Sequence, residues 1–294
     1  MNSLNNLKVL SVLIFAVVTV SCESGYKDIN AEDEKITPSD SVFSDRTYHI
    51  FIPENYVPSG RPLPLIFAFH GAGDSGLSFK KHSGLDQEAQ KINAFVVYPD
   101  AKVSNWNEGC DCNNAARLKI DDIGFVKFLI KKIKSNFKID STKIYAVGYS
   151  QGGLFAQYVA CTLSDKFSAV ATVSATFSVP LSQNCFPNSP INLLMLNGTK
   201  DYILPYLGLN DGSFSLLSAN DAIRYWSIKN SCNAIANVEY LNVNSSISVR
   251  KETYANCKNN VETVIYIVEG GGHDWFIYPE IYAPKIVTEF FKNH

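Results

Sequence analysis

The stretch from Lys143 to Gly153 reads KIYAVGYSQGG and decides the fold. Its first half is a largely apolar run typical of a buried strand, and a helical pattern begins directly after the serine. Between them, Gly148 to Gly152 form a G-x-S-x-G pattern, which in this strand–turn–helix context predicts a nucleophile elbow rather than a chance Gly-Ser-Gly turn. Such a turn is strained, and larger side chains in place of the glycines would clash. We therefore predict that Ser150 is a nucleophile, held above a sheet at the start of a helix.

Strands and helices alternate on both sides of this turn. We expect strands at residues 46–52, 64–69, 94–98, 143–148, 169–174, 191–196 and 261–268. We expect helices near residues 84–92, 121–136, 151–164, 218–230 and 283–292. This alternation predicts an α/β fold, with a mostly parallel central sheet covered by helices on both faces, in a single catalytic domain over residues 46–294. The first strand should be an antiparallel edge strand, and segments 236–243 and 247–254 form either a hairpin or an irregular insertion.

A serine hydroxyl needs a base to take its proton. Of the five histidines, only one lies on a loop after a late buried strand, in Gly270-Gly271-Gly272-His273-Asp274-Trp275. The glycines allow a tight backbone path back toward the elbow. Proteins with this kind of elbow place the serine, the acid and the histidine in that order along the chain. His273 is therefore the predicted base.

The acid that orients such a histidine should follow the preceding parallel strand. The strand at 191–196 leads into Asn197-Gly198-Thr199-Lys200-Asp201. This places Asp201 to accept a hydrogen bond from the ring of His273, which fixes the tautomer of the base. Three rivals are less well placed, being farther from the strand end or next to the base: Asp211, Asp221 and Asp274.

A tetrahedral intermediate also needs donors for its oxyanion. We expect one donor to be the backbone N–H of Gln151, the residue after the nucleophile. The other should come from the loop after the second strand, where we assign the backbone N–H of Ala72, with Gly71 and Gly73 as alternatives. We interpret His70, which begins this loop, as an anchor of the loop rather than a second base.

Two further groups of side chains have chemical interest. Trp106, Tyr206 and Trp275 lie on loops, where they either line an aromatic acyl pocket or cap the core. Cys110 and Cys112 lack neighbours in the sequence that would complete a four-ligand metal site, so we expect no metal there and prefer a disulfide. We expect no cofactor.

Composition narrows the class of function. The chain has 294 residues, 46% of them hydrophobic, which is typical of a folded protein. The 26 basic residues nearly balance the 28 acidic ones, giving a net charge of −2. A nucleic-acid partner is therefore not expected. The length after the first 45 residues suits one domain with no second module, and we expect a monomer.

The amino terminus is predicted to direct export. Lys8 is followed by an apolar run from Val9 to Val20, which is too short for a membrane-spanning helix of about 20 residues. A charged start, a short apolar run and a small residue before the cleavage site are typical of a signal peptide. The ending at Cys22 resembles a bacterial lipoprotein signal, cut before a cysteine that is then lipidated, although Thr19 departs from the preferred Leu, Val or Ile.

We therefore predict a lipoprotein-type signal peptide over residues 1–21, a lipidated Cys22 and a polar tether over residues 22–45. The protein would touch a membrane through the lipid anchor only, at the outer surface or in the periplasm. The alternative is ordinary cleavage, with Cys22 left as a free thiol and the protein secreted. Six cysteines remain, an even number that predicts three disulfides in an exported protein: Cys110, Cys112, Cys161, Cys185, Cys232 and Cys257.

From about Arg46 onward the chain resembles the polyhydroxybutyrate depolymerase and feruloyl esterase group of α/β-hydrolases, close to carbohydrate esterase family one. The matching stretches are Tyr48-His49-Ile50-Phe51-Ile52-Pro53, Pro64-Leu65-Ile66-Phe67-Ala68-Phe69-His70-Gly71, Tyr98-Pro99-Asp100, Trp106, Asp121-Asp122-Ile123-Gly124-Phe125, Gly148-Tyr149-Ser150-Gln151-Gly152-Gly153, Asn197-Gly198-Thr199-Lys200-Asp201 with Pro205-Tyr206, and Gly270-Gly271-Gly272-His273-Asp274-Trp275. The elbow is common to many hydrolases, whereas the last two stretches are narrower. One departure is Asn197, where relatives often have His.

The resemblance implies that Ser150, Asp201 and His273 form a catalytic triad. It also implies disulfides between Cys232 and Cys257 and between Cys161 and Cys185, which leaves Cys110 to pair with Cys112. The expected function is that of an exported serine esterase that removes feruloyl or acetyl groups from plant polysaccharide through an acyl-enzyme. The alternative substrate is a hydroxyalkanoate polymer or oligomer. A serine peptidase and a non-catalytic carbohydrate-binding protein are further alternatives.

Overall fold

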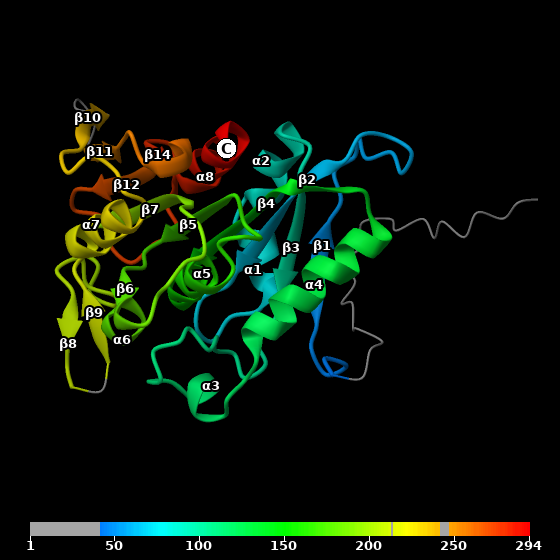
Figure 1. The fold of residues 1–294 in the computed structure, drawn as a ribbon, viewed down its shortest axis with the longest axis horizontal. Helices are drawn as coiled ribbons and strands as arrows, with labels where there is room; N and C mark the ends of the chain where they lie inside the picture. Colours follow the sequence, from blue (N-terminus) through cyan, green and yellow to red (C-terminus); the bar gives the residue numbers. More distant parts are fainter. Residues whose placement is uncertain (1–41, 213, 242–246) are drawn as a thin grey trace, which may run out of the picture. The chain divides into compact units, whose positions relative to one another are not determined.

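The elbow around Ser150 follows β4 (Ile139–Tyr149), an inner strand of a nine-stranded sheet in the computed structural model (Figure 1). The structure describes residues 42–212, 214–241 and 247–294. All of these residues fall within one compact unit, residues 33–294. The predicted signal peptide, Cys22 and most of the predicted tether lie outside the described residues. Within the described ranges, no helix has both the length and the apolar character needed to cross a membrane.

The main sheet has the strand order β1-β3-β2-β4-β5-β7-β12-β11-β10. The strands from β3 to β12 run parallel to their neighbours. At the two edges, β1 on one side and β11 and β10 on the other are antiparallel. The strands are β1 (Tyr48–Phe51), β2 (Leu63–Phe69), β3 (Phe95–Pro99), β4 (Ile139–Tyr149), β5 (Ala169–Val173), β7 (Asn192–Gly198), β10 (Asn237–Leu241), β11 (Val249–Tyr254) and β12 (Thr263–Val268).

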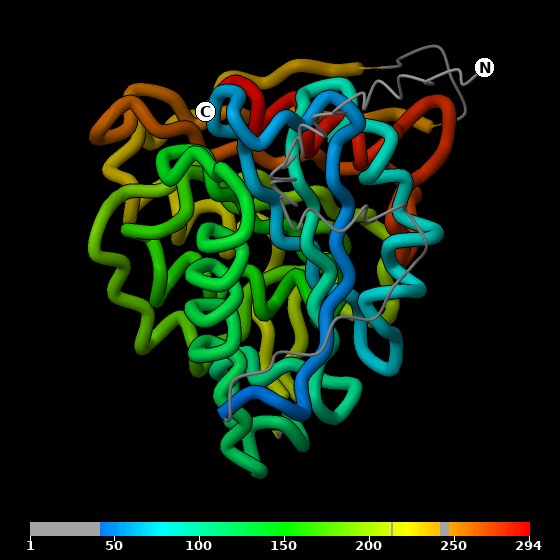
Figure 2. Tube along the Cα trace, turned by 90° about the vertical axis from the view of Figure 1, so that its right-hand side faces the viewer, coloured from blue at the N-terminus to red at the C-terminus, as the bar shows by residue number. Residues whose placement is uncertain are grey.

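Helices cover both faces of this sheet, and Figure 2 shows green and cyan helices on opposite sides of the strands. Alternate residues of β2 point to opposite faces: Phe67 and Phe69 join the cluster beneath α4, α5 and α7, and Ile66 and Ala68 join the cluster beneath α1, α2 and α8. Because both faces are buried, the strand is apolar along its whole length. The helices are α1 (Gly76–His82), α2 (Leu85–Lys91), α3 (Asn114–Arg117), α4 (Asp122–Asn136), α5 (Gln151–Thr162), α6 (Val179–Gln183), α7 (Ala219–Lys229), α8 (Ala283–Asn293) and the 3₁₀ turn η1 (Lys258–Asn260).

The fold class and every long strand and helix expected from the sequence are confirmed. The hairpin alternative for the segment near residue 240 is correct, and β11 joins this hairpin to the main sheet by pairing with β12. The shortest elements were not predicted. A three-stranded sheet is formed by β6 (Phe177–Ser178), β9 (Ser215–Leu217) and β8 (Leu209–Asn210), and a small hairpin by β13 (Ile277–Tyr278) and β14 (Ile281–Tyr282). Strands of two or three residues are too short to show a hydrophobic period.

The helix α1 was also missed, because its seven residues span only two turns. Its start is defined instead by Ser75, whose hydroxyl accepts a hydrogen bond from the N–H of Ser78. This helix follows directly on the loop expected to hold the second oxyanion donor. Its position therefore fixes the far end of that loop.

Three disulfides join the six cysteines of the described chain in the pairs that the resemblance implies. They are Cys110–Cys112, Cys161–Cys185 and Cys232–Cys257. The second joins α5, the helix of the elbow, to the segment after α6, and the third joins the end of α7 to η1. The first closes a short loop between β3 and α4, which bears on the candidate active site below.

Candidate active site

Ser150 occupies the sharp turn between β4 and α5 that the sequence predicts. Its φ is 54° and its ψ is −124°, a backbone conformation that non-glycine residues rarely adopt. The two flanking glycines are required by contact. A side chain at Gly148 would collide with the carbonyl of Gly152, and a side chain at Gly152 would collide with the carbonyl oxygens of Phe69 and His70. The turn therefore brings β2, β4 and the start of α5 into direct backbone contact beneath the serine hydroxyl.

Ser150, His273 and Asp201 converge at the carboxyl ends of the parallel strands. Nε2 of His273 lies 2.8 Å from Oγ of Ser150, and Nδ1 of the same ring lies 2.8 Å from Oδ2 of Asp201. A carboxylate only accepts hydrogen bonds, so Nδ1 must carry the ring hydrogen and Nε2 is left to accept from the serine hydroxyl. The arrangement has the geometry of a nucleophile, a base and an orienting acid.

The buried Asp201 carboxylate is held by the loop that follows it. Its Oδ1 accepts hydrogen bonds from the N–H groups of Ile203 and Leu204, each at 2.9 Å, which leaves Oδ2 for the histidine. The rivals considered from the sequence make other contacts. Asp221 accepts from Ser218 at the start of α7, and Asp274 accepts from Tyr278.

The backbone next to His273 is tied down by two residues that sequence reasoning missed. The hydroxyl of Ser174 donates to the carbonyl of Asp274 at 2.6 Å and accepts from the N–H of Asp274 at 3.1 Å. The hydroxyl of Tyr149 donates to the carbonyl of His273 at 3.3 Å. Burial, with Asp274 and Asp201 nearby, raises the pKa of Tyr149 to about 12, so this hydroxyl remains a donor at neutral pH. The only sequence signal for Tyr149 was its place inside the elbow pattern.

The loop after β2 passes directly over the nucleophile. A side chain at Gly71 would lie 3.4 Å from Cβ of Ser150, so this loop and the first turn of α5 face each other across the serine. Within the described chain, the N–H groups of Ala72 and Gln151 donate to no protein acceptor. A helix amino terminus and a neighbouring loop can together offer two such donors to an anion.

His70 anchors this loop, as the sequence interpretation holds. Its Nε2 accepts from the N–H of Ala101 at 3.0 Å, so Nδ1 carries the hydrogen and donates to the carbonyl of Gly71 at 2.8 Å. Burial lowers the pKa of this imidazole, and the neutral form is the one that can make both hydrogen bonds. The ring therefore ties the loop to the end of β3.

A second loop, residues 105–113, grips the side chain of Gln151. Its members Trp106 and Glu108 both accept hydrogen bonds from Nε2 of Gln151, at 3.0 Å and 2.8 Å. Burial raises the pKa of the Glu108 carboxyl to about 7, while hydrogen bonds from Gln151 and Asn113 act in the opposite direction. Sequence reasoning did not single out Glu108, and no local pattern identifies it.

The three aromatic residues considered as substrate-lining are all buried, which favours the alternative that they cap the core. Trp106 stacks on Phe155 and donates from Nε1 to the carbonyl of His70 at 2.9 Å. Trp275 donates to the carbonyl of Ser83, and Tyr206 donates to Asn220. Each ring has its polar atom satisfied inside the protein, which is how buried Trp and Tyr side chains are accommodated.

One cluster in the described chain has the ligand types of a metal site, namely Glu108, Cys110 and Cys112, whose ligand atoms lie within 4.8 Å of one another. Both sulfur atoms are joined in a disulfide. Soft metals bind the thiolate form of cysteine. The cluster as it stands therefore does not fit a metal ion.

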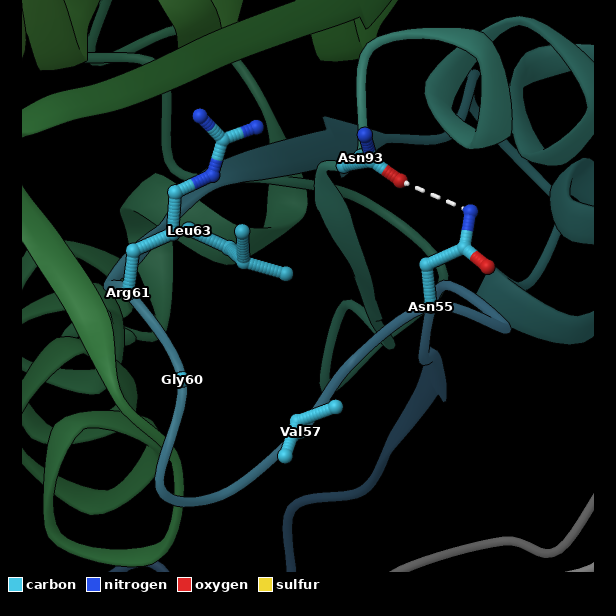
Figure 3. A pocket seen from close by; sticks show the side chains of 6 residues that line it. All are labelled: Asn55, Val57, Gly60, Arg61, Leu63 and Asn93. Atoms are coloured by element: carbon cyan, nitrogen blue, oxygen red, sulfur yellow. Dashed lines mark hydrogen bonds between the residues drawn. The ribbon is translucent and has the colours of Figure 1, made fainter.

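A pocket of about 260 Å³ lies at the other end of the sheet (Figure 3). It is lined by residues near the amino end of β2 and the turn before β3, among them Leu63 and Asn93, and Nδ2 of Asn55 donates to Asn93 across it at 3.3 Å. Ser150, His273 and Asp201 lie at the carboxyl ends of the parallel strands, where ligands of open α/β sheets bind. This pocket is therefore not part of the candidate active site.

Comparisons with known proteins agree with this geometry. The model of a family described as "Putative esterase" matches residues 39–200, so the chain belongs to that family. The chain is similar to "Putative esterase NocK" of Nocardia uniformis subsp. tsuyamanensis, with 25% identity over 79% of this chain and 70% of that protein. It is also similar to feruloyl esterase B of Piromyces equi, with 27% identity over 74% of this chain, although the match spans only 41% of that relative.

Among solved structures, the acetyl xylan esterase from Aspergillus awamori superposes with a TM-score of 0.61 over 88% of this chain and 98% of that one. The identity is 13%, so this likeness concerns the fold alone. Family and fold together define a carboxylic ester hydrolase of the α/β-hydrolase class and confirm the resemblance found in the sequence.

Proposed function

We propose that this esterase works through a Ser150–His273–Asp201 triad and an acyl-enzyme. The observation that carries the proposal is the position of the His273 ring, which lies 2.8 Å from both Oγ of Ser150 and Oδ2 of Asp201. A serine hydroxyl is a weak nucleophile until a neighbouring base accepts its proton, and that base must be held in the correct tautomer. The buried Asp201 carboxylate, fixed by two backbone N–H groups, supplies that orientation.

In the proposed reaction, Nε2 of His273 takes the Ser150 proton as Oγ attacks the ester carbonyl carbon. The carbonyl oxygen becomes negatively charged, and the N–H groups of Gln151 and Ala72 stabilise it. When the tetrahedral intermediate collapses, the bond to the alcohol breaks and His273 gives its proton to the departing oxygen. Water then attacks the acyl-enzyme in the same way, which releases the acid and restores Ser150.

We propose a feruloyl or acetyl ester of plant polysaccharide as the substrate. Feruloyl esterase B is among the relatives, and an acetyl xylan esterase is among the structural neighbours. Exposed apolar side chains beside the acid support an aromatic acyl group in particular. Tyr202, Ile203 and Leu207 leave 83%, 65% and 84% of their surface exposed, and we call these three side chains the apolar rim.

Leu204, which lies between Ile203 and Leu207 in the sequence, connects the apolar rim to the helix that begins at the elbow. Leu204 belongs to a small apolar cluster with Leu154, which lies in the first turn of α5. Apolar side chains gathered at the surface beside a site offer contact to an apolar part of a ligand. A feruloyl group has such a part, whereas an acetyl group offers only a methyl.

The triad is tested by hydrolysis of p-nitrophenyl acetate. We expect Ser150→Ala to lose at least about 10⁴-fold in kcat, because loss of the nucleophile of a triad has effects of this size or larger. Ser135→Ala, which removes an exposed hydroxyl of α4 bonded only locally, should match the wild type. Equal rates for Ser150→Ala and the wild type would refute the triad.

The acyl preference is tested by comparing kcat/KM on methyl ferulate, acetylated xylan and hydroxybutyrate oligomers. Leu207→Ser should lower kcat/KM on methyl ferulate by about threefold to tenfold. This is the loss expected when a leucine side chain that the bound substrate partly covers is removed. It should leave p-nitrophenyl acetate unchanged. Ile235→Ser, at an exposed apolar residue after α7, is the matched control. A preference of the wild type for hydroxybutyrate oligomers would contradict the proposed substrate.

We also propose that the protein is exported and anchored by lipid on Cys22. The three disulfides support an oxidising compartment, because such bonds are rare in the cytosol. Metabolic labelling with a palmitate analogue should mark the wild type and leave Cys22→Ser unmarked. An unlabelled chain that retains Cys22 would contradict the anchor.

A further inference from the structure

Glu108 is a buried carboxyl group, 2% exposed, in the loop that grips Gln151. We propose that Glu108 is a positioning residue for ester hydrolysis: through the side chain of Gln151, it fixes the backbone N–H that receives the oxyanion. The proposal rests on the proposed function, because it concerns the same oxyanion. It adds a second carboxyl group to the machinery, separate from the acid of the triad.

The first step concerns the Gln151 side chain, whose amide is fully occupied. Its Nε2 donates to Oε2 of Glu108 at 2.8 Å and to the carbonyl of Trp106 at 3.0 Å. Its Oε1 accepts from the N–H of Trp106 at 3.1 Å and from Asn105 at 3.4 Å. A residue held by four hydrogen bonds at the end of its side chain has little freedom in its own backbone dihedrals. Gln151 is the first residue of α5, so this restraint acts on a peptide unit next to the nucleophile.

The second step concerns the loop, because a positioning residue must itself be held. Asn113 donates from its side chain to Oε2 of Glu108 and, at 2.9 Å, to the carbonyl of Trp106. The N–H of Asn107 donates to Asp122 at 2.8 Å, and Asp122 is paired with the buried Arg46 at 2.7 Å. The Cys110–Cys112 disulfide closes the remaining end of the loop. Glu108 is therefore attached to α4 and to the segment just before β1 rather than to a free surface segment.

The group that holds Gln151 is a carboxyl, which is an unusual choice at a buried position. A buried charge is costly, and a neutral side chain of similar shape often gives equal or greater stability. The burial that raises the pKa of Glu108, together with the Asp122 carboxylate, makes this site an expensive place for an acid. A carboxylate binds an amide N–H more strongly than a neutral oxygen does, although the restraint on Gln151 requires only the position of Oε2. Perturbed carboxyl groups of this kind gather at functional sites.

The two oxygens of Glu108 divide their roles. Oε2 receives both Gln151 and Asn113, whereas Oε1 lies 3.4 Å from Sγ of Cys110 in the disulfide. Disulfide sulfur has no hydrogen to donate, so a proton bound to the carboxyl would sit on Oε1. Oε2 then stays available to Gln151 in both protonation states. A glutamine in place of Glu108 presents the same geometry, with its carbonyl oxygen toward Gln151 and its amide toward the sulfur.

The experiment compares Glu108→Ala and Glu108→Gln with the wild type, per folded active site counted by end-point labelling with a fluorophosphonate. We expect Glu108→Ala to lower kcat on p-nitrophenyl acetate by about tenfold to a hundredfold with KM within about twofold, because a displaced oxyanion donor costs less than the 10²–10³ of a removed one. An alkyl boronic acid, which places a charged oxygen at the oxyanion position, should lose affinity by the same factor. Glu108→Gln should retain activity within about threefold, since it keeps the geometry.

Gln157→Ala is the matched control, because Gln157 is a second buried glutamine of α5 whose hydrogen bonds go to Thr176 and Trp226, away from the nucleophile. It should lower the melting temperature and leave kcat per folded site unchanged. If Glu108→Ala behaves like this control, with kcat and boronate affinity unchanged, the proposal is overturned and Glu108 is structural only. If Ser150→Ala retains hydrolysis, the proposed function fails instead, so the two failures are distinguishable.

Discussion

The two sides of the nucleophile are built differently. On the acid–base side, Asp201 and His273 follow adjacent strands, and two backbone N–H groups hold the Asp201 carboxylate. Two hydroxyls, those of Ser174 and Tyr149, support the backbone beside His273. On the oxyanion side, buried side chains make the connections: His70 spans one loop, and Glu108 and Asn113 span the other. Strand order brings the first pair to one edge of the sheet, whereas the second side depends on particular side chains meeting across the structure.

The acid–base side follows from the order of residues along the chain, whereas the oxyanion side does not. Parallel strands bring their carboxyl ends to one edge, so the order of the three residues along the chain predicts that Ser150, Asp201 and His273 converge there. Glu108 contacts a residue 43 positions away in the sequence, from a loop with no periodic pattern. The three aromatic residues show the same limit. A tryptophan on a loop can be buried when its ring N–H finds an acceptor elsewhere in the chain. For Trp275 that acceptor is the carbonyl of Ser83, which is distant in the sequence.

The largest effect is expected from a substitution that impairs the acid–base side and leaves the oxyanion side intact. Asp201→Asn should lower kcat by roughly 10³- to 10⁴-fold with a small change in melting temperature, because the amide favours the ring tautomer whose Nε2 carries a hydrogen and cannot accept the serine proton. Steady-state kinetics on p-nitrophenyl acetate measure this effect.

The control for that change is Asp221→Asn, at an exposed aspartate in the first turn of α7 that accepts a hydrogen bond from the N-cap Ser218, and it should leave kcat unchanged. If Asp201→Asn retains more than a tenth of the wild-type rate, Asp201 is not the orienting acid. The acid–base side could then not be described as Asp201 and His273 on adjacent strands.

An effect of intermediate size concerns Glu108 on the oxyanion side, namely the pH dependence of the free energy of unfolding. Burial raises the pKa of Glu108 to about 7 from its ordinary value of 4.5, so the folded protein keeps this proton over a pH range in which the unfolded chain has lost it. The stability that protonation contributes is present in full below pH 4.5 and is lost as the pH rises through about 7. Glu108→Gln lacks this titration.

The free-energy difference between Glu108→Gln and the wild type should therefore shift in favour of the variant between pH 5 and pH 8, by roughly 3 kcal/mol at most. Urea unfolding at both pH values measures it, and every other titrating group is common to the two proteins. A difference that stays constant with pH would show that Glu108 does not titrate in this range.

The smallest effect concerns the hydroxyl of Tyr149, which donates to the carbonyl of His273 at 3.3 Å. Tyr149→Phe should lower kcat by no more than about threefold, the change expected when a single long neutral hydrogen bond is removed beside several others. Stopped-flow turnover of p-nitrophenyl acetate has the needed precision. A loss above tenfold would mean that the acid–base side depends on side chains as much as the oxyanion side does.

The proposed mechanism requires that Ser150 forms a covalent acyl-enzyme. Acid quenching of the enzyme during turnover of p-nitrophenyl acetate, followed by peptide mass spectrometry, tests it most directly. We predict one acetyl group on the peptide that carries Ser150, and on no peptide of Ser150→Ala. Hydrolysis at the wild-type rate with no acetyl group on Ser150 at any quench time, or an acetyl group on another residue that accounts for turnover, would contradict the claim.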